Sequence, residues 1–166
     1  ATRDRDMLAD FLGADRLFAA YALCDLDDRE FGRTRWGVAL DQGRPVAVAL
    51  EYLGSSPQPL FVMGEPAGVM GVLREVIRPR TAYLAARPEL LDAVAAAYRV
   101  ADGPVMVRMW VDRTMFQPAA PNAVRLVPAD VGELNRLYDF GLGSWLPSDA
   151  VANGVYYGLR VNGQLV

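Results

Sequence analysis

Acidic side chains are concentrated in one short segment, the sequence CDLDDRE at residues 24–30. Its carboxylates are hard oxygen ligands, so a site for a cation such as Ca²⁺ or Mg²⁺ is one interpretation. Acids at a helix C-terminus are disfavoured by the helix dipole and need cationic partners, and Arg29, Arg33 and Arg35 lie in or near the segment. The favoured interpretation is therefore a surface ion network, and no metal site is predicted.

Histidine is absent from the chain, and Cys24 is its single cysteine. An internal disulfide cannot form, and a zinc site would have to depend on one thiolate and carboxylates. The loop serines Ser55 and Ser56 have no histidine to activate them as nucleophiles. Within this chain, the sequence excludes histidine-based catalysis and a structural zinc.

The composition is that of a globular protein, with 52% apolar and 22% charged residues among 166. The net charge is −3, the isoelectric point is about 5.0, and no run of adjacent arginines occurs, which argues against nucleic acid as a main partner. No apolar run approaches the roughly 20 residues that span a bilayer, and the start ATRDRDML lacks the apolar region of a signal peptide. We therefore expect a cytoplasmic protein with no membrane partner.

Apolar periodicity and turn residues predict helices and strands throughout the first part of the chain. The predicted elements are two helices within residues 7–24, strands at 35–40, 45–53 and 60–63, a helix beginning near Pro66, a strand at 81–86, a helix opened by Pro88, and a strand at 105–112. The predicted strand 45–53 is apolar on both faces, which is typical of a central strand covered by helices on each side. The fold class predicted is α/β (α+β), with a mixed, mostly antiparallel sheet.

A proline- and alanine-rich stretch without periodicity indicates a linker at residues 118–123, between a first domain at 1–117 and a second segment at 124–166. In the second segment we expect a strand, a helix, a brief helix from Ser148 to Gly154, and a strand at 155–161. Asn162-Gly163 then predicts a type I′ hairpin turn, but only three residues follow it. The hairpin is thus unfinished, as if a longer unit began here.

Two sets of residues carry a resemblance to the GNAT superfamily of N-acetyltransferases. Residues 124–166, VRLVPADVGELNRLYDFGLGSWLPSDAVANGVYYGLRVNGQLV, resemble the opening of the GNAT fold, and AYALCDLDD and TRWGVAL resemble the N-terminal domain of such proteins. The resemblance implies a degenerate GNAT-like N-terminal domain followed by the start of a catalytic GNAT domain. It further implies transfer of an acetyl group from acetyl-CoA to a small-molecule or peptide amine.

In that superfamily a glycine-rich loop at a helix N-terminus holds the pyrophosphate of acetyl-CoA, and this sequence stops before that loop. The corresponding turn of the first domain is VMGEPAGVMG, with Gly64 and Gly68 but no preceding Arg or Gln. Glu65 places a negative charge where a phosphate would sit, and Pro66 lacks a backbone donor. We therefore expect a plain strand-to-helix turn, and a chain that is inactive alone although acetyl-CoA is the cosubstrate of the full-length protein.

The resemblance also draws attention to GSWLPSD, since this region borders the acyl-acceptor site in such proteins. Trp145 is a candidate substrate-binding residue, and so are Tyr156 and Tyr157, which alternate faces on one strand. Packing of all three in the core is the competing interpretation. The catalytic and cofactor-binding residues stay unassigned.

A different class of function also fits the sequence, namely a non-catalytic GNAT-like module for binding, regulation or dimerisation, because a fold does not imply its function. We also expect the short segment 124–166 either to dock on the first domain or to pair with a second copy of the chain. Its strand 155–161 would otherwise leave an apolar edge uncovered. A homodimer is therefore one expected state.

Overall fold

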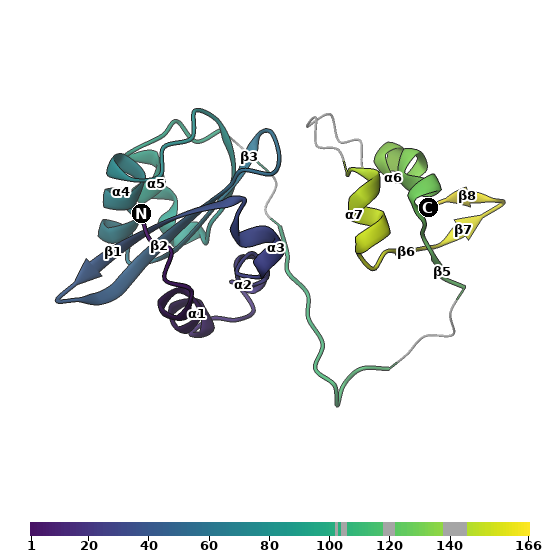
Figure 1. Cartoon of the computed structure of the whole chain (residues 1–166), viewed down its shortest axis with the longest axis horizontal. Coiled ribbons are helices and arrows are strands. Elements are labelled where there is room, and N and C mark those ends of the chain that lie inside the picture. Colours follow the sequence, from purple (N-terminus) through teal and green to yellow (C-terminus); the bar gives the residue numbers. More distant parts are fainter. Residues whose placement is uncertain (102, 104–105, 118–121, 138–145) are drawn as a thin grey trace. The chain divides into compact units, whose positions relative to one another are not determined.

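A computed structural model of the chain describes all residues except 102, 104–105, 118–121 and 138–145. The chain divides into two compact units, Ala1–Trp110 and Val111–Val166 (Figure 1). Most of the predicted linker at 118–123 lies outside the described residues. Each unit has its own apolar core, so each is considered by itself.

The first unit is built around a four-stranded sheet with the order β1-β2-β3-β4. Its strands are β1 (Thr34–Asp41), β2 (Arg44–Tyr52), β3 (Gln58–Gly64) and β4 (Ala82–Ala85). The pairs β1–β2 and β2–β3 are antiparallel, whereas β3 and β4 are parallel. The prediction of a mixed, mostly antiparallel sheet is confirmed.

Helices cover both faces of this sheet (Figure 1). On one face lie α1 (Arg5–Gly13), α2 (Ala20–Cys24) and α3 (Asp28–Phe31), and on the other lie α4 (Pro66–Glu75), the 3-10 helix η1 (Pro88–Leu90) and α5 (Leu91–Ala95). The central strand β2 contributes Val48 and Leu50 to the first core and Ala47 and Ala49 to the second. Its predicted two-sided burial is therefore confirmed.

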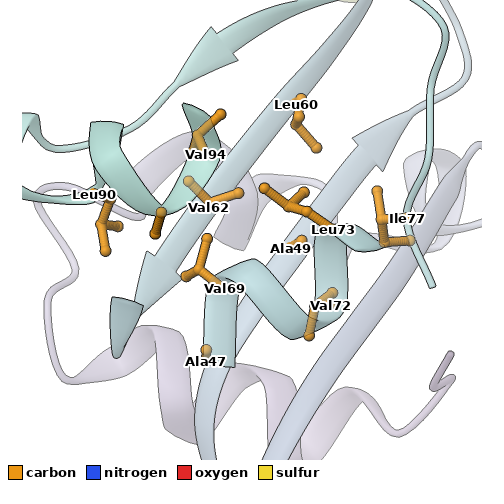
Figure 2. Packing of buried hydrophobic residues seen from close by; sticks show 11 residues of the cluster. Ala47, Ala49, Leu60, Val62, Val69, Val72, Leu73, Ile77, Leu90 and Val94 are labelled. Carbon is orange, nitrogen blue, oxygen red and sulfur yellow. The ribbon is translucent and has the colours of Figure 1, made fainter. Parts of the chain in front are cut away.

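Small residues allow α4 to lie close to the sheet. A Cβ atom on Gly68 of α4 would stand 2.7 Å from the Cβ of Ala47, nearer than real Cβ atoms approach. Figure 2 shows Val69 and Val72 of α4 packed with Ala47 and Ala49. The alanines of β2 and the glycine of α4 thus set the spacing of this layer.

The predicted strand at 105–112 is not formed, because its described residues 106–112 pair with no strand. Met106, Val107 and Met109 are more than 80% exposed, and Trp110 is 63% exposed. Apolar, strand-forming residues are compatible with a strand, but a strand exists only where a neighbour completes its backbone hydrogen bonds. The prediction was wrong because that neighbour cannot be read from the segment itself.

The second unit has two helices between short strands, in the predicted order. Its elements are β5 (Val124–Arg125), the 3-10 helix η2 (Pro128–Asp130), α6 (Val131–Leu137), α7 (Ser148–Asn153), β6 (Tyr157–Gly158), β7 (Arg160–Val161) and β8 (Gln164–Leu165). Leu126, Leu134 and Val151 form its small buried core. Arg160 joins β7 to the helices through ion pairs of 2.7 Å with Asp130 and with Glu133.

The hairpin turn predicted at Asn162-Gly163 is present between β7 and β8. Asn162 has φ of 51° and Gly163 has φ of +82°, the left-handed values that a type I′ turn requires at both positions. The turn pairs Val161 with Gln164 and Arg160 with Leu165. The predicted single strand 155–161 is instead divided into β6, which pairs with β5, and β7, which pairs with β8.

Candidate functional site

An apolar pocket of about 280 Å³ lies on the face of the first unit that carries α2. Its apolar lining comes from Phe18, Ala22, Leu50, Pro59, Phe61 and Ala85, and its polar lining comes from Tyr21, Asp25, Tyr52 and Arg108. A concave, mostly apolar site with a few convergent polar groups is the usual form of a small-molecule site. We therefore take this pocket, named the Asp25 pocket below, as the candidate site.

The floor of the Asp25 pocket is made by neighbouring strands. Leu50 of β2 and Phe61 of β3 are paired in register, so their side chains share the face that packs against α2. Phe18 stacks on Phe61 with ring centroids 5.0 Å apart and planes inclined by 36°. On α2 the inward residue is Ala22, whose methyl group leaves space where a larger side chain would fill the pocket.

Asp25 is the group with the most chemical interest in this pocket. It directly follows α2, and its backbone N–H donates to the carbonyl of Tyr21 at 3.0 Å. Burial, and to a smaller extent the nearby charge of Glu30, raise the pKa of the Asp25 carboxyl from 3.8 to about 6. None of the ion pairs found among the described residues includes Asp25.

Tyr52 and Glu30 form a hydrogen-bonded pair beside Asp25. The Tyr52 hydroxyl donates to Oε2 of Glu30 at 2.7 Å, and Arg33 lies 4.0 Å from the same oxygen. Burial, followed by the hydrogen bond to Glu30, raises the pKa of the Tyr52 hydroxyl. Glu30 therefore has partners, whereas Asp25 lines the pocket without an ion-pair partner among the described residues.

Arg108 supplies the positive group of the lining, and its guanidinium is held in place. Nη1 donates to the carbonyl of Leu17 at 2.7 Å and also to that of Phe18, and Cζ lies 4.8 Å from the centroid of the Tyr21 ring. These contacts connect the exposed segment after α5 to the start of α2. Arg108 therefore lines one side of the pocket, and no ion pair found among the described residues joins it to Asp25.

The surface ion network that the sequence predicted for the rest of the acidic segment is formed in part, since Arg33 pairs with Glu30. The Asp27 carboxylate caps α3 by accepting from the N–H of Arg29 at 3.0 Å, and Asp28 pairs with Arg5. Arg35, expected in this network, instead pairs with Glu51 at 3.2 Å. Across the described residues, no group of three or more Cys, Asp or Glu side chains is arranged to hold a metal ion.

The turn at Gly64 is explained by packing. Gly64 has φ of +113°, and a Cβ there would lie 2.2 Å from the carbonyl oxygen of Val46. The N–H of Glu65 donates to that same oxygen at 2.8 Å, and Pro66 has no N–H. The first backbone positions of the turn are thus unable to donate to a phosphate, which supports the interpretation as a plain strand-to-helix turn.

The described structure includes two of the three predicted substrate-binding residues, so their predicted convergence is not tested. Trp145 lies outside the described residues, as does Tyr138. Tyr156 packs against the core of the second unit, whereas Tyr157 is 59% exposed on β6. Sequence reasoning missed Asp25, Tyr52 and Arg108 as a set, because they come from three separate segments and match no spacing motif.

Comparison of the chain with protein-family models, with curated proteins and with solved structures found no match. In the part of the chain that the structure describes, no helix combines the length and the apolar character needed to cross a membrane. The function of the chain is therefore inferred from its topology and from the side chains of the Asp25 pocket.

Proposed function

We propose that the protein is a GNAT-type N-acetyltransferase, of which these residues form the N-terminal portion. The observation that carries the proposal is a repeated topology. In the first unit Thr2 pairs antiparallel with Trp36, which follows α1 to α3; in the second unit β5 pairs antiparallel with β6, which follows α6 and α7. Two units that begin alike support the resemblance to a degenerate GNAT-like domain followed by a second GNAT-like unit.

The reaction would be direct attack of an acceptor amine on the thioester carbonyl of acetyl-CoA. A backbone N–H would stabilise the oxyanion, and a carboxylate or water would remove the proton from the amine. The turn at Gly64 argues against acetyl-CoA binding in the first unit, since Glu65 donates to Val46 and Pro66 has no donor. We assign no catalytic residue to the chain.

A second function, a non-catalytic binding module, is favoured by the Asp25 pocket. Its carboxylate has no ion-pair partner among the described residues, and the surrounding walls are apolar. An ammonium group on a compact apolar molecule would match both features. The first unit would then hold an amine without transferring an acetyl group to it.

Two measurements separate these functions. Thiol release from acetyl-CoA, assayed on the protein isolated from its source cells with a panel of primary amines, is expected to show turnover. Calorimetry of acetyl-CoA on the 166-residue chain is expected to show a Kd of about 1 mM or weaker, an affinity worth only about 4 kcal/mol. Micromolar binding to the chain would contradict our interpretation of the Gly64 turn, and amine binding without turnover would favour the module.

A further inference from the structure

A second hollow in the first unit, of about 360 Å³, lies beyond the C-terminal end of α4. Its charged lining consists of Arg74, Arg78 and Arg80, and the rest of its wall comes from Leu73, Pro79, Ala97 and Tyr98. The wall contains no acidic residue, although the chain as a whole has a net charge of −3. The hollow, named the arginine hollow below, is therefore a local concentration of positive charge.

The three guanidinium groups of the arginine hollow have no acidic partners among the described residues. The ion pairs found there use Arg5, Arg33, Arg35, Arg87 and Arg160 instead. A site that gathers cations without counterions attracts an anion, and the attraction is greatest at low ionic strength.

The backbone beneath these arginines is anchored. Nη2 of Arg74 donates to the carbonyl of Ala96 at 3.0 Å, which ties α4 to the end of α5. Ile77 is fully buried and Pro79 is buried between Arg78 and Arg80, so the arginines project from a constrained segment. Such anchoring lowers the entropy that is lost when a ligand is bound.

Tyr98 gives the arginine hollow an aromatic, largely apolar wall. Its hydroxyl donates to the carbonyl of Ile77 at 3.4 Å, and its half-buried ring lines the hollow beside Leu73 and Ala97. A ligand that reaches the arginines can therefore rest an aromatic or aliphatic part on this wall. The combination suits a small molecule with one strongly anionic end better than a free inorganic ion.

The simplest alternative is that the arginines only complement the dipole of α4. That explanation applies to Arg74, which lies in the last turn of the helix. It does not apply equally to Arg78 and Arg80, which follow the helix end at Glu75. A helix end carries only about half a unit of negative charge, so three guanidinium groups leave a surplus of positive charge.

We propose that the arginine hollow binds a small phosphomonoester, with the phosphate at Arg78 and Arg80 and its organic part against Tyr98. Guanidinium groups bind phosphate through paired, charge-assisted hydrogen bonds, which makes arginine suited to this ligand. The hollow lies at the opposite end of α4 from Gly64, about 15 Å away for a helix of this length. It is thus separate from the turn where the resemblance would place a pyrophosphate, and it does not depend on the proposed acetyl transfer.

The test is calorimetric titration of the 166-residue chain with phenyl phosphate at low ionic strength and pH 8, where the phosphate is a dianion. We expect one site per chain, and amide shifts near residues 73–80 and 96–98 in NMR spectra. Arg78→Gln and Arg80→Gln should each weaken binding by about tenfold or more, the usual effect of removing one charged hydrogen-bonding partner. Phenol, which has the ring without the phosphate, should not bind.

Arg44→Gln is the matched control, because it removes an equal charge from an exposed position at the start of β2. An equal loss of affinity in Arg44→Gln would show diffuse attraction to the whole surface and would overturn the proposal. So would the absence of heat and of NMR shifts at millimolar phenyl phosphate. Displacement of phenyl phosphate by a short DNA duplex that binds far more tightly would assign the surface to nucleic acid and would also overturn it.

Discussion

Replacing Asp25 with asparagine should stabilise the first unit at neutral pH and leave it unchanged at acidic pH. Burial in the Asp25 pocket, together with the nearby charge of Glu30, raises the pKa of this carboxyl from 3.8 to about 6, so the fold favours the protonated form. The stability that this preference contributes is fully present below pH 3.8 and is lost as the pH rises through about 6. Above that pH the folded chain holds an ionised carboxylate in an apolar pocket, and Asp25→Asn removes that charge while keeping the shape.

The size of the effect follows from the pKa change. A rise from 3.8 to about 6 corresponds to roughly 3 kcal/mol, at about 1.4 kcal/mol for each pKa unit. Asp25 is only half-buried, and solvent screens a charge in that position, so we expect a gain of about 1 kcal/mol. For a chain of this size, that gain corresponds to a melting temperature higher by about 2–4 °C.

Urea unfolding at pH 7.5 and at pH 4, followed by tryptophan fluorescence, measures the free energy of unfolding of Asp25→Asn against that of the unsubstituted chain. Trp36 is fully buried in the core beside the Asp25 pocket and reports on the first unit. Asp10→Asn, at an exposed position of α1, is the matched control and should change little at either pH. A loss of stability at pH 7.5 would show that ionised Asp25 makes a favourable contact, and a gain that persists at pH 4 would show that charge is not its cause.

Two other features allow direct tests. Gly64→Ala should cost about 2–3 kcal/mol in the free energy of unfolding, because its φ is +113° and the new Cβ would meet the Val46 carbonyl oxygen at 2.2 Å. Gly71→Ala, where nothing lies within 4 Å of the new Cβ, should instead stabilise α4 by up to about 1 kcal/mol; equal effects in urea unfolding would refute this account of Gly64. In hydrogen exchange, the amides of residues 156–161 should exchange quickly or show protection that rises with concentration, since β6, β7 and β8 pair over only two residues each. Slow exchange that is independent of concentration in a strictly monomeric sample would contradict the expectation that this strand needs further partners.

Local features of the fold were predictable because their causes lie within a few residues. The two-sided burial of β2 follows from the nearly continuous apolar run of residues 45–53, and the turn at Asn162-Gly163 follows from residues that tolerate positive φ. The helices opened by Pro66 and Pro88 follow from the preference of proline for the first helical turn. None of these predictions required knowledge of a distant contact.

The binding surfaces were decided by contacts between distant segments. The raised pKa of Asp25 comes first from burial, in a pocket that β2, β3 and the segment carrying Arg108 line, and second from the charge of Glu30. A spacing motif cannot show which of the four acids in residues 24–30 is buried. Arg74, Arg78 and Arg80 are separated by other residues in sequence, so no basic run is visible, but the end of α4 and the end of α5 bring them around one hollow. The segment at 105–112 also depends on distant contacts, but there the contact is missing for its described residues 106–112. Its composition permits a strand, but whether the strand forms is determined by a partner edge that only the tertiary structure supplies.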